Sequence, residues 1–245
     1  MTQKIKIGNL NSLCSSVINK ERIAYILYPT DILSEWIEPA AEKYGVTIVV
    51  ITGMDWQNVF SPWPAPGVPK GDPDFKGESP DFLKLLQSKV IPGIENTLLM
   101  NTDVERSLVG VSMSGLFALW QWMKCDTFRN IASLSGSFWY AGFIEWMRTI
   151  QIPPKTGKGF FLLGDQESHS KVKAFNSVGI DTAEIIKILK SSGINAEFES
   201  VPGNHFANGI ARLDKAFYAL YNDEICKRGF PSQGCFRPGR SNANV

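Results

Sequence analysis

The sequence contains few of the residues that bind metal ions or form disulfide frameworks. Its 245 residues include two histidines, His169 and His205, and four cysteines, none of them in a C-x-x-C pair. Zinc sites are built from clustered Cys and His ligands, so we expect no metal ion and no other cofactor. Isolated cysteines in a chain of this length are typical of reduced thiols, with a pairing of Cys226 and Cys235 as the alternative.

An excess of charge of one sign and long apolar runs are also absent. Lys and Arg total 25 against 24 Asp and Glu, a net charge of +1 that would attract neither nucleic acid nor an anionic membrane. Residues 1–6 are polar and basic, and no stretch of about 18 apolar residues occurs. We therefore expect a soluble cytoplasmic protein without a nucleic-acid or membrane partner, and a homodimer remains open. The charge does not indicate the substrate.

Apolar segments of strand length alternate with helical patterns along most of the chain. Runs bounded by turn residues predict eight strands, at 5–10, 13–18, 23–28, 47–52, 107–110, 131–135, 160–163 and 196–201. Helical periodicity predicts helices at 35–44, 81–96, 115–125, 139–149, 181–192 and 208–221. This order predicts a single α/β domain over 1–245 with a mostly parallel sheet flanked by helices. A tail from about residue 228 is expected to pack loosely.

One hexapeptide, G-V-S-M-S-G from Gly110 to Gly115, lies between a short apolar run and a helical pattern. It is similar to the G-x-S-x-G nucleophile elbow, a tight strand-to-helix turn in which the residues two positions from the serine must be small. Gly110 and Ser114 meet that requirement around Ser112. The turn places the Ser112 hydroxyl at the start of a helix, where free N–H groups favour negative charge. We therefore predict Ser112 as the nucleophile of an acyl-transfer reaction.

A serine nucleophile needs a base, and histidine has suitable basicity near neutral pH. His205 lies in a turn directly after the last predicted strand, so we predict it as the base; His169, in a more polar loop, is the alternative. The carboxylate that orients the imidazole is expected between Ser112 and His205 in chain order. The turn after 160–163 offers Asp165 and Glu167. We favour Glu167 because its longer side chain can turn back over the sheet toward His205.

Two backbone N–H groups are expected to bind the oxyanion of the reaction. One is the N–H of Met113, next after the nucleophile. The other is expected in the loop after the third predicted strand, where Pro29 has no N–H to donate. Thr30 is therefore the first candidate, and Asp31 is the second.

Several aromatic residues are expected near the ends of the predicted strands. Trp56 and Trp139 are predicted to form apolar walls for the substrate, together with Trp63 and Phe138, although several of these side chains could belong to the core instead. A second group, on helical patterns, is assigned to packing: Trp120, Trp122 and Trp146. Residues 53–80, with six prolines and four glycines, are expected to cover the site, because no large cap fits between 135 and 160.

Together these motifs resemble the α/β-hydrolase superfamily, and more narrowly the esterase family that includes S-formylglutathione hydrolases, feruloyl and siderophore esterases and mycolyltransferases. The resemblance covers nearly the whole chain and is carried by five segments: 28–30, 110–115, 134–139, 164–167 and 203–206. It implies Ser112 as nucleophile, His205 as base and a carboxylate from the 164–167 turn, or a Ser–His dyad as in some siderophore esterases.

The resemblance also implies the chemistry. It implies a serine esterase that cleaves a carboxylic ester through an acyl-enzyme, with esters of carbohydrates, aromatic acids or siderophores as candidate substrates. An acyltransferase that uses the same acyl-enzyme is one alternative, because an alcohol can replace water in the second step. A hydrolase-like protein that binds a ligand without turnover is the other, because a fold does not fix a function.

Overall fold

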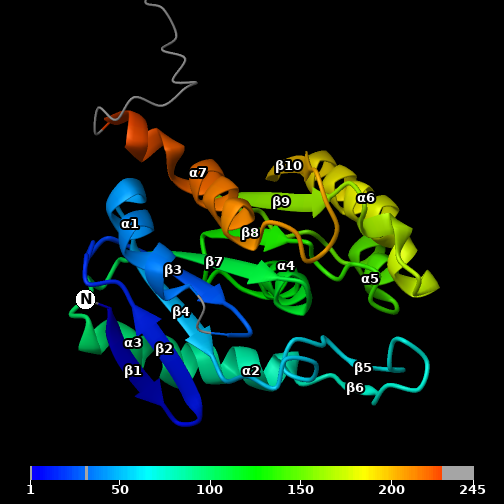
Figure 1. The fold of residues 1–245 in the computed structure, drawn as a ribbon, viewed down its shortest axis with the longest axis horizontal. Helices are drawn as coiled ribbons and strands as arrows, with labels where there is room; N and C mark the ends of the chain where they lie inside the picture. Colours follow the sequence, from blue (N-terminus) through cyan, green and yellow to red (C-terminus); the bar gives the residue numbers. More distant parts are fainter. Residues whose placement is uncertain (1, 31–32, 228–245) are drawn as a thin grey trace, which may run out of the picture.

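A central sheet of eight strands organises the computed structural model, which describes residues 2–30 and 33–227, without the side chains of 223–227. In spatial order the strands are β1 (Gln3–Ile7), β2 (Leu10–Cys14), β4 (Thr47–Thr52), β3 (Arg22–Leu27), β7 (Glu105–Val111), β8 (Asn130–Leu134), β9 (Lys158–Gly164) and β10 (Asn195–Val201) (Figure 1). β2 pairs antiparallel with β1 and β4, and the pairs from β4 to β10 are parallel. The predicted mostly parallel eight-stranded sheet is confirmed.

Helices cover both faces of the sheet (Figure 1). One face packs against α1 (Ser34–Tyr44) and α7 (Gly209–Lys227). The other packs against α2 (Ser79–Leu85), a π-helical turn η1 (Leu86–Val90), α3 (Ile91–Thr97), α4 (Met113–Lys124), α5 (Phe143–Thr149) and α6 (Val178–Ser191). Because side chains alternate along a strand, β3 serves both cores: Ile26 faces α1 and α7, whereas Tyr25 and Leu27 face the opposite layer.

The carboxyl ends of the parallel strands lie at one edge of the sheet. The segments that leave β3, β7, β8, β9 and β10 therefore meet there, and they contain Tyr28, Ser112, Ser135, Glu167 and His205. Between β8 and β9 the chain forms α5 and no inserted cap domain, as predicted. The topology thus brings the residues predicted for catalysis to the edge where α/β sheets bind ligands.

The first two strands are displaced from their predicted positions. They were expected at 5–10 and 13–18 but occupy 3–7 and 10–14, joined by the two-residue loop Gly8-Asn9. Gly8 has a φ of 59°, and glycine at the first central position is typical of a tight hairpin turn. The apolar pattern runs through this turn, so periodicity alone placed both strands too late.

The Pro-rich segment after β4 is an ordered part of the fold. It contains a short hairpin of β5 (Pro64–Ala65) and β6 (Phe75–Lys76), which the sequence pattern did not reveal. Phe60 is fully buried and packs against Phe82 of α2 and Phe117 of α4. Trp63 packs against α5 and donates its Nε1–H to the carbonyl of Ala141 at 2.9 Å. Buried aromatic residues therefore anchor the segment to the body of the domain.

Two of the cysteines lie within the described residues as free thiols. Cys14 is buried and Cys125 is partly buried. Burial raises the pKa of the Cys14 thiol to about 12, so Cys14 is an unreactive core residue. The side chain of Cys226 and the tail from 228, which contains Cys235, lie outside what the structure describes, so the alternative pairing of these two cysteines stays a prediction. No helix within the described residues is long and apolar enough to cross a membrane.

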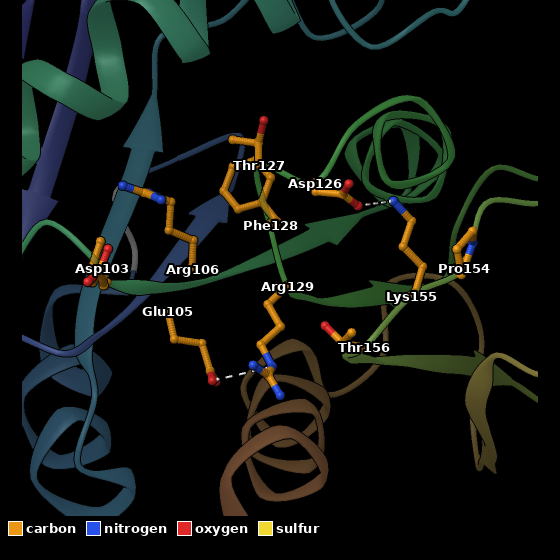
Figure 2. A pocket seen from close by; sticks show the side chains of 11 residues that line it. Asp103, Glu105, Arg106, Asp126, Thr127, Phe128, Arg129, Pro154, Lys155 and Thr156 are labelled. Atoms are coloured by element: carbon orange, nitrogen blue, oxygen red, sulfur yellow. Dashed lines mark hydrogen bonds and ion pairs between the residues drawn. The ribbon is translucent and has the colours of Figure 1, made fainter.

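A hollow of about 460 Å³ lies at the opposite edge of the sheet, where β7, β8 and β9 begin. Four of its charged side chains form two ion pairs, which Figure 2 shows as dashed lines: Arg129 Nε lies 3.5 Å from Glu105, and Lys155 donates to Asp126 at 2.7 Å. Arg106, also in its lining, forms a two-pronged ion pair with Glu95. This edge therefore holds paired charges far from Ser112, which follows the other end of β7.

Candidate active site

Ser112 occupies the sharp turn between β7 and α4. Its φ and ψ are 56° and −120°, a combination that side-chain-bearing residues rarely adopt. Gly110 must lack a side chain, because a Cβ there would lie 2.1 Å from the carbonyl oxygen of Ser114. The strained angles and the close packing together hold the Ser112 hydroxyl above the end of the sheet, as expected for a nucleophile elbow.

Ser114 takes the place of the final glycine of the elbow motif and has a structural role. Its side chain is buried, and its Oγ accepts the N–H of Val111 at 2.8 Å. The same hydroxyl lies 2.9 Å from the carbonyl of Leu27, at the end of β3. The Ser114 hydroxyl therefore joins the elbow to the neighbouring strand β3, so a serine can stand where the motif has glycine.

Ser112, His205 and Glu167 form an unbroken chain of hydrogen-bond contacts. His205 Nε2 lies 3.1 Å from Ser112 Oγ, and His205 Nδ1 lies 2.8 Å from Glu167 Oε2. His205 comes from the loop after β10, and Glu167 begins the 3₁₀ turn η2 (Glu167–His169) after β9. This geometry can pass a proton from the hydroxyl to the imidazole while the carboxylate stabilises the resulting positive charge.

The second carboxylate oxygen of Glu167 is held by three donors. Oε1 accepts the N–H of Gly164 at 2.7 Å, the hydroxyl of Ser135 at 2.7 Å and Nη1 of Arg212 at 2.8 Å. Burial opposes ionisation of Glu167, but hydrogen bonds from His205, Ser135 and Gly164 outweigh it, and the pKa of Glu167 lies below its ordinary value. The residue is therefore a buried carboxylate with only Oε2 facing His205.

Asp165 and His169, the alternatives for the acid and the base, lie near the site but outside the contact chain of Ser112. Asp165 is exposed, and its Oδ1 accepts the N–H of Gly203 at 3.0 Å, a contact that fixes the loop before His205. The carboxylate that contacts the imidazole is that of Glu167. His169 is exposed in η2 and lines a cavity near Ser112, whereas His205 contacts the Ser112 hydroxyl directly.

Of the residues predicted to bind the oxyanion, Met113 is placed at the start of a helix, whereas Thr30 is exposed in the loop after β3. Met113 is the first residue of α4, so its N–H belongs to the free donors of a helix N-terminus. Thr30 is exposed, and Tyr28 and Pro29 just before it line the cavity beside Ser112. Asp31 lies outside the described residues. The sequence did not indicate a role for Ser137, yet its buried hydroxyl lies 3.3 Å from Ser112 Oγ.

Two cavities meet at Ser112 and His205. The smaller, of about 260 Å³, is lined by Trp56 together with Tyr28 and Pro29. The larger, of about 450 Å³, is lined by Trp139 and Phe175, whose ring centroids lie 4.5 Å apart. The predicted wall residues Trp56 and Trp139 thus stand one in each cavity. Trp56 is the residue of the Pro-rich segment that lines the smaller cavity. The walls of the larger cavity come from η2, η3 (Lys173–Ser177) and neighbouring loops.

The other aromatic residues considered for the site belong to the core. Phe138 is buried between Phe143 and Phe161, and Trp63 packs on α5. Trp120 and Trp122 are buried in α4, and Trp146 is partly buried, consistent with their assignment to packing. Phe206 was not singled out, yet it lines both cavities, is 91% exposed and meets the His205 ring edge-on.

Arg212 is a site residue that sequence reasoning missed. It lies in α7, is 4% exposed and contacts Glu167 through Nη1 and the carbonyl of Asn204 through Nη2 at 2.7 Å. One signal could have revealed it: Arg212 precedes Ala216 by four residues and therefore shares the apolar face of a predicted helix. A charged residue on such a face requires a buried partner.

Sequence comparisons relate the chain to a family of known proteins. The profile of the family described as Putative esterase matches residues 28–205, a range that contains Ser112, Glu167 and His205. The chain is 26% identical over 168 residues to the uncharacterized protein YbbA of Bacillus subtilis (strain 168), covering 66% of this chain and 67% of YbbA. It is 26% identical over 130 residues to the apo-salmochelin esterase of Escherichia coli O6:H1, covering 51% of this chain and 41% of that esterase.

The fold has a solved counterpart. The structure of an IroE-like serine hydrolase from Shewanella oneidensis superposes with a TM-score of 0.74 at 16% identity, covering 91% of this chain and 80% of the other. At that identity the likeness concerns the fold, an eight-stranded mostly parallel sheet flanked by helices. With the profile match over more than half of the sequence, it leads to one assignment: the chain belongs to the putative esterase family of α/β-hydrolases.

Proposed function

We propose that the protein is a serine esterase that hydrolyses a carboxylic ester through an acyl-enzyme. Ser112 is the nucleophile, His205 the general base and Glu167 the carboxylate that orients His205. The observation that carries the proposal is the contact chain from Ser112 Oγ through His205 to Glu167, at a backbone turn strained as a nucleophile elbow. Family membership supports the same class of reaction.

The reaction begins when Ser112 Oγ attacks the ester carbonyl and His205 Nε2 takes its proton. Negative charge develops on the carbonyl oxygen, beside the N–H of Met113 at the start of α4. As the intermediate collapses, His205 returns the proton to the departing alcohol. Water, deprotonated by His205, then attacks the acyl-enzyme and releases the acid, which restores the Ser112 hydroxyl.

The two cavities suit the two substituents of an ester carbonyl, because both include Ser112. One receives the acyl group and the other the alcohol. The aromatic walls favour a substrate with a planar aromatic group, for example an ester of an aromatic acid or of a siderophore. The apo-salmochelin esterase among the relatives supports this choice.

A direct test uses the full chain with p-nitrophenyl acetate and with a fluorophosphonate. A burst of nitrophenol equal to the enzyme concentration, followed by slower turnover, is the expected result for an acyl-enzyme. The phosphonate is expected to modify one residue, Ser112, located by mass spectrometry of the digested protein. Absence of both the burst and the modification contradicts the proposed function.

Replacing Glu167 by Gln is expected to lower kcat by roughly two to four orders of magnitude, the range seen when a triad carboxylate is lost. The amide cannot stabilise the protonated imidazole, and it also leaves Arg212 without its carboxylate partner. Asp165→Asn is the matched control, because Asp165 contacts Gly203 and not His205. Steady-state kinetics on the folded variants check this; a larger loss at Asp165 than at Glu167 would reverse the assignment.

Replacing Trp139 by Ala is expected to reduce kcat/KM for an aromatic ester about fivefold, since a lost aromatic contact is worth on the order of 1 kcal/mol. Trp139 pairs with Phe175 in the larger cavity, so the loss is expected to be small for a substrate without an aromatic group. Hydrolysis of ethyl benzoate and ethyl acetate, followed by titration of the released acid, compares the two. Equal losses for both esters would show that the larger cavity does not select aromatic groups.

A further inference from the structure

We infer that Arg212 is a positioning residue that fixes Glu167 and the His205 loop relative to each other and limits the negative charge that His205 faces. One planar guanidinium reaches both parts of the site. Nη1 donates to Glu167 Oε1 at 2.8 Å and contacts Ser135 Oγ, while Nη2 donates at 2.7 Å to the carbonyl of Asn204, the residue before His205. The acid and the base-bearing loop are thereby joined through a single side chain from α7.

The surrounding backbone is shaped to admit this side chain. Gly164, at the end of β9, leaves room for it: a Cβ there would lie 2.6 Å from Nη2 of Arg212 and 2.2 Å from the carbonyl oxygen of Gly203. The Arg212 side chain is 5% exposed and that of Glu167 is 3% exposed. A lysine could supply the charge, but its single nitrogen cannot reproduce the planar fork that spans two partners.

A role in stability alone explains the arrangement poorly. Buried ion pairs are often no more stabilising than apolar residues of similar volume. The Nε of Arg212 is buried and has no hydrogen-bond partner within the described residues, which adds a desolvation cost. The contacts that Arg212 does form, with Glu167, Ser135 and the carbonyl of Asn204, all lie beside the contact chain of Ser112.

The charge of Arg212 has a separate consequence for His205. Glu167 stabilises the protonated imidazole, and the guanidinium on the other side of the carboxylate offsets part of that attraction. Removing the positive charge therefore strengthens the attraction between the carboxylate and the protonated imidazole. Within residues 2–30 and 33–227, the titratable and charged groups around His205 come from several elements. They are Tyr28 after β3, Asp165 after β9, Glu167 and His169 in η2, and Arg212 in α7, which carries the guanidinium charge.

The test follows the histidine ring protons of the full chain by NMR as a function of pH. The chain has two histidines, so His205→Ala assigns both signals. Arg212→Met and Arg212→Gln remove the charge, and Arg212→Lys keeps it. Arg106→Met is the control, because Arg106 lies at the opposite edge of the sheet (Figure 2) and forms a two-pronged pair with Glu95. Circular dichroism and thermal melting identify the folded variants.

We expect the titration midpoint of His205 to rise by about half a pH unit or more in a folded neutral variant. It should stay unchanged in Arg212→Lys and Arg106→Met, and His169 should not respond in any of them. Arg212→Lys should still lose roughly tenfold to a hundredfold in kcat/KM, because the fork that aligns the two loops is gone. An unchanged midpoint in a folded neutral variant, or full kcat/KM in Arg212→Lys, overturns the inference. Failure of both neutral variants to fold assigns Arg212 a structural role and overturns it as well.

The kinetic arm of this test rests on the proposed function, whereas the NMR arm does not. If the midpoint moves as expected but the native chain shows neither burst nor phosphonate labelling, the proposed esterase activity fails and the role of Arg212 in charge balance stands. If the native chain is active and the midpoint does not move, the proposed function stands and the inference fails.

Discussion

Ser112→Ala is expected to reduce hydrolysis of p-nitrophenyl acetate by about 10⁴-fold or more and to abolish fluorophosphonate labelling, since loss of a triad nucleophile has effects of that order. The substitution removes the attacking oxygen and its contacts with His205 and Ser137. It leaves the Cβ at the elbow, so the strained backbone is kept and the variant is expected to fold. Burst kinetics and mass spectrometry of the labelled protein provide the measurement.

Ser114→Ala is the matched control, two residues along the same turn. It removes a buried hydroxyl that contacts Val111 and Leu27, so we expect a loss of stability of about 1–3 kcal/mol. Labelling of Ser112 should persist below the melting temperature, because Ser114 does not contact His205. Loss of labelling in folded Ser114→Ala, with labelling retained in Ser112→Ala, would show that the nucleophile had been assigned to the wrong serine.

His205→Ala is expected to be nearly as damaging as Ser112→Ala. Once the imidazole is removed, the one described side chain that still contacts Ser112 Oγ is the hydroxyl of Ser137, which is not a base at neutral pH. Residues that act as a unit are not additive, so the double variant Ser112→Ala/His205→Ala should be scarcely slower than either single variant. Steady-state rates of the three proteins check this.

His169→Ala serves as the control for His205→Ala. Its side chain lines the larger cavity and is exposed, but the imidazole in contact with Ser112 is that of His205. We expect a change of less than about fivefold in kcat, of the size that a surface residue near a site produces. A loss at His169 comparable to that at His205 would require two histidines in the mechanism.

The fold was predictable because its signals are local. Eight short apolar runs and six helical patterns describe the sheet and its layers, and strand order then places Ser112 and His205 at one edge. The errors occur where a local signal is overridden. The Gly8-Asn9 turn interrupts an apolar run, and the β5–β6 hairpin depends on how Phe60 and Trp63 pack far along the chain.

The site was predictable to the extent that chain order determines it. Sequence could place a carboxylate after β9, but the choice between Asp165 and Glu167 depended on side-chain reach, and the structure shows how each is used. Chain order does not indicate Arg212, and a lone arginine in a helix is usually exposed; the one sequence signal is its place on the apolar face of the predicted helix. Its role arises from the tertiary packing of α7 against the loops after β9 and β10.

The position of Arg212 on α7 has a consequence for synthesis on the ribosome. The elbow, the acid and the base emerge in that order, but the buried carboxylate of Glu167 gains its guanidinium partner only after residue 212 has been made and α7 has docked. Domains generally fold once their long-range contacts are available, and burial of an unpaired charge is unfavourable. We therefore expect the η2 turn to be exposed to water in nascent chains that end before α7. The proposed esterase activity would then first be detectable once α7 packs over the sheet.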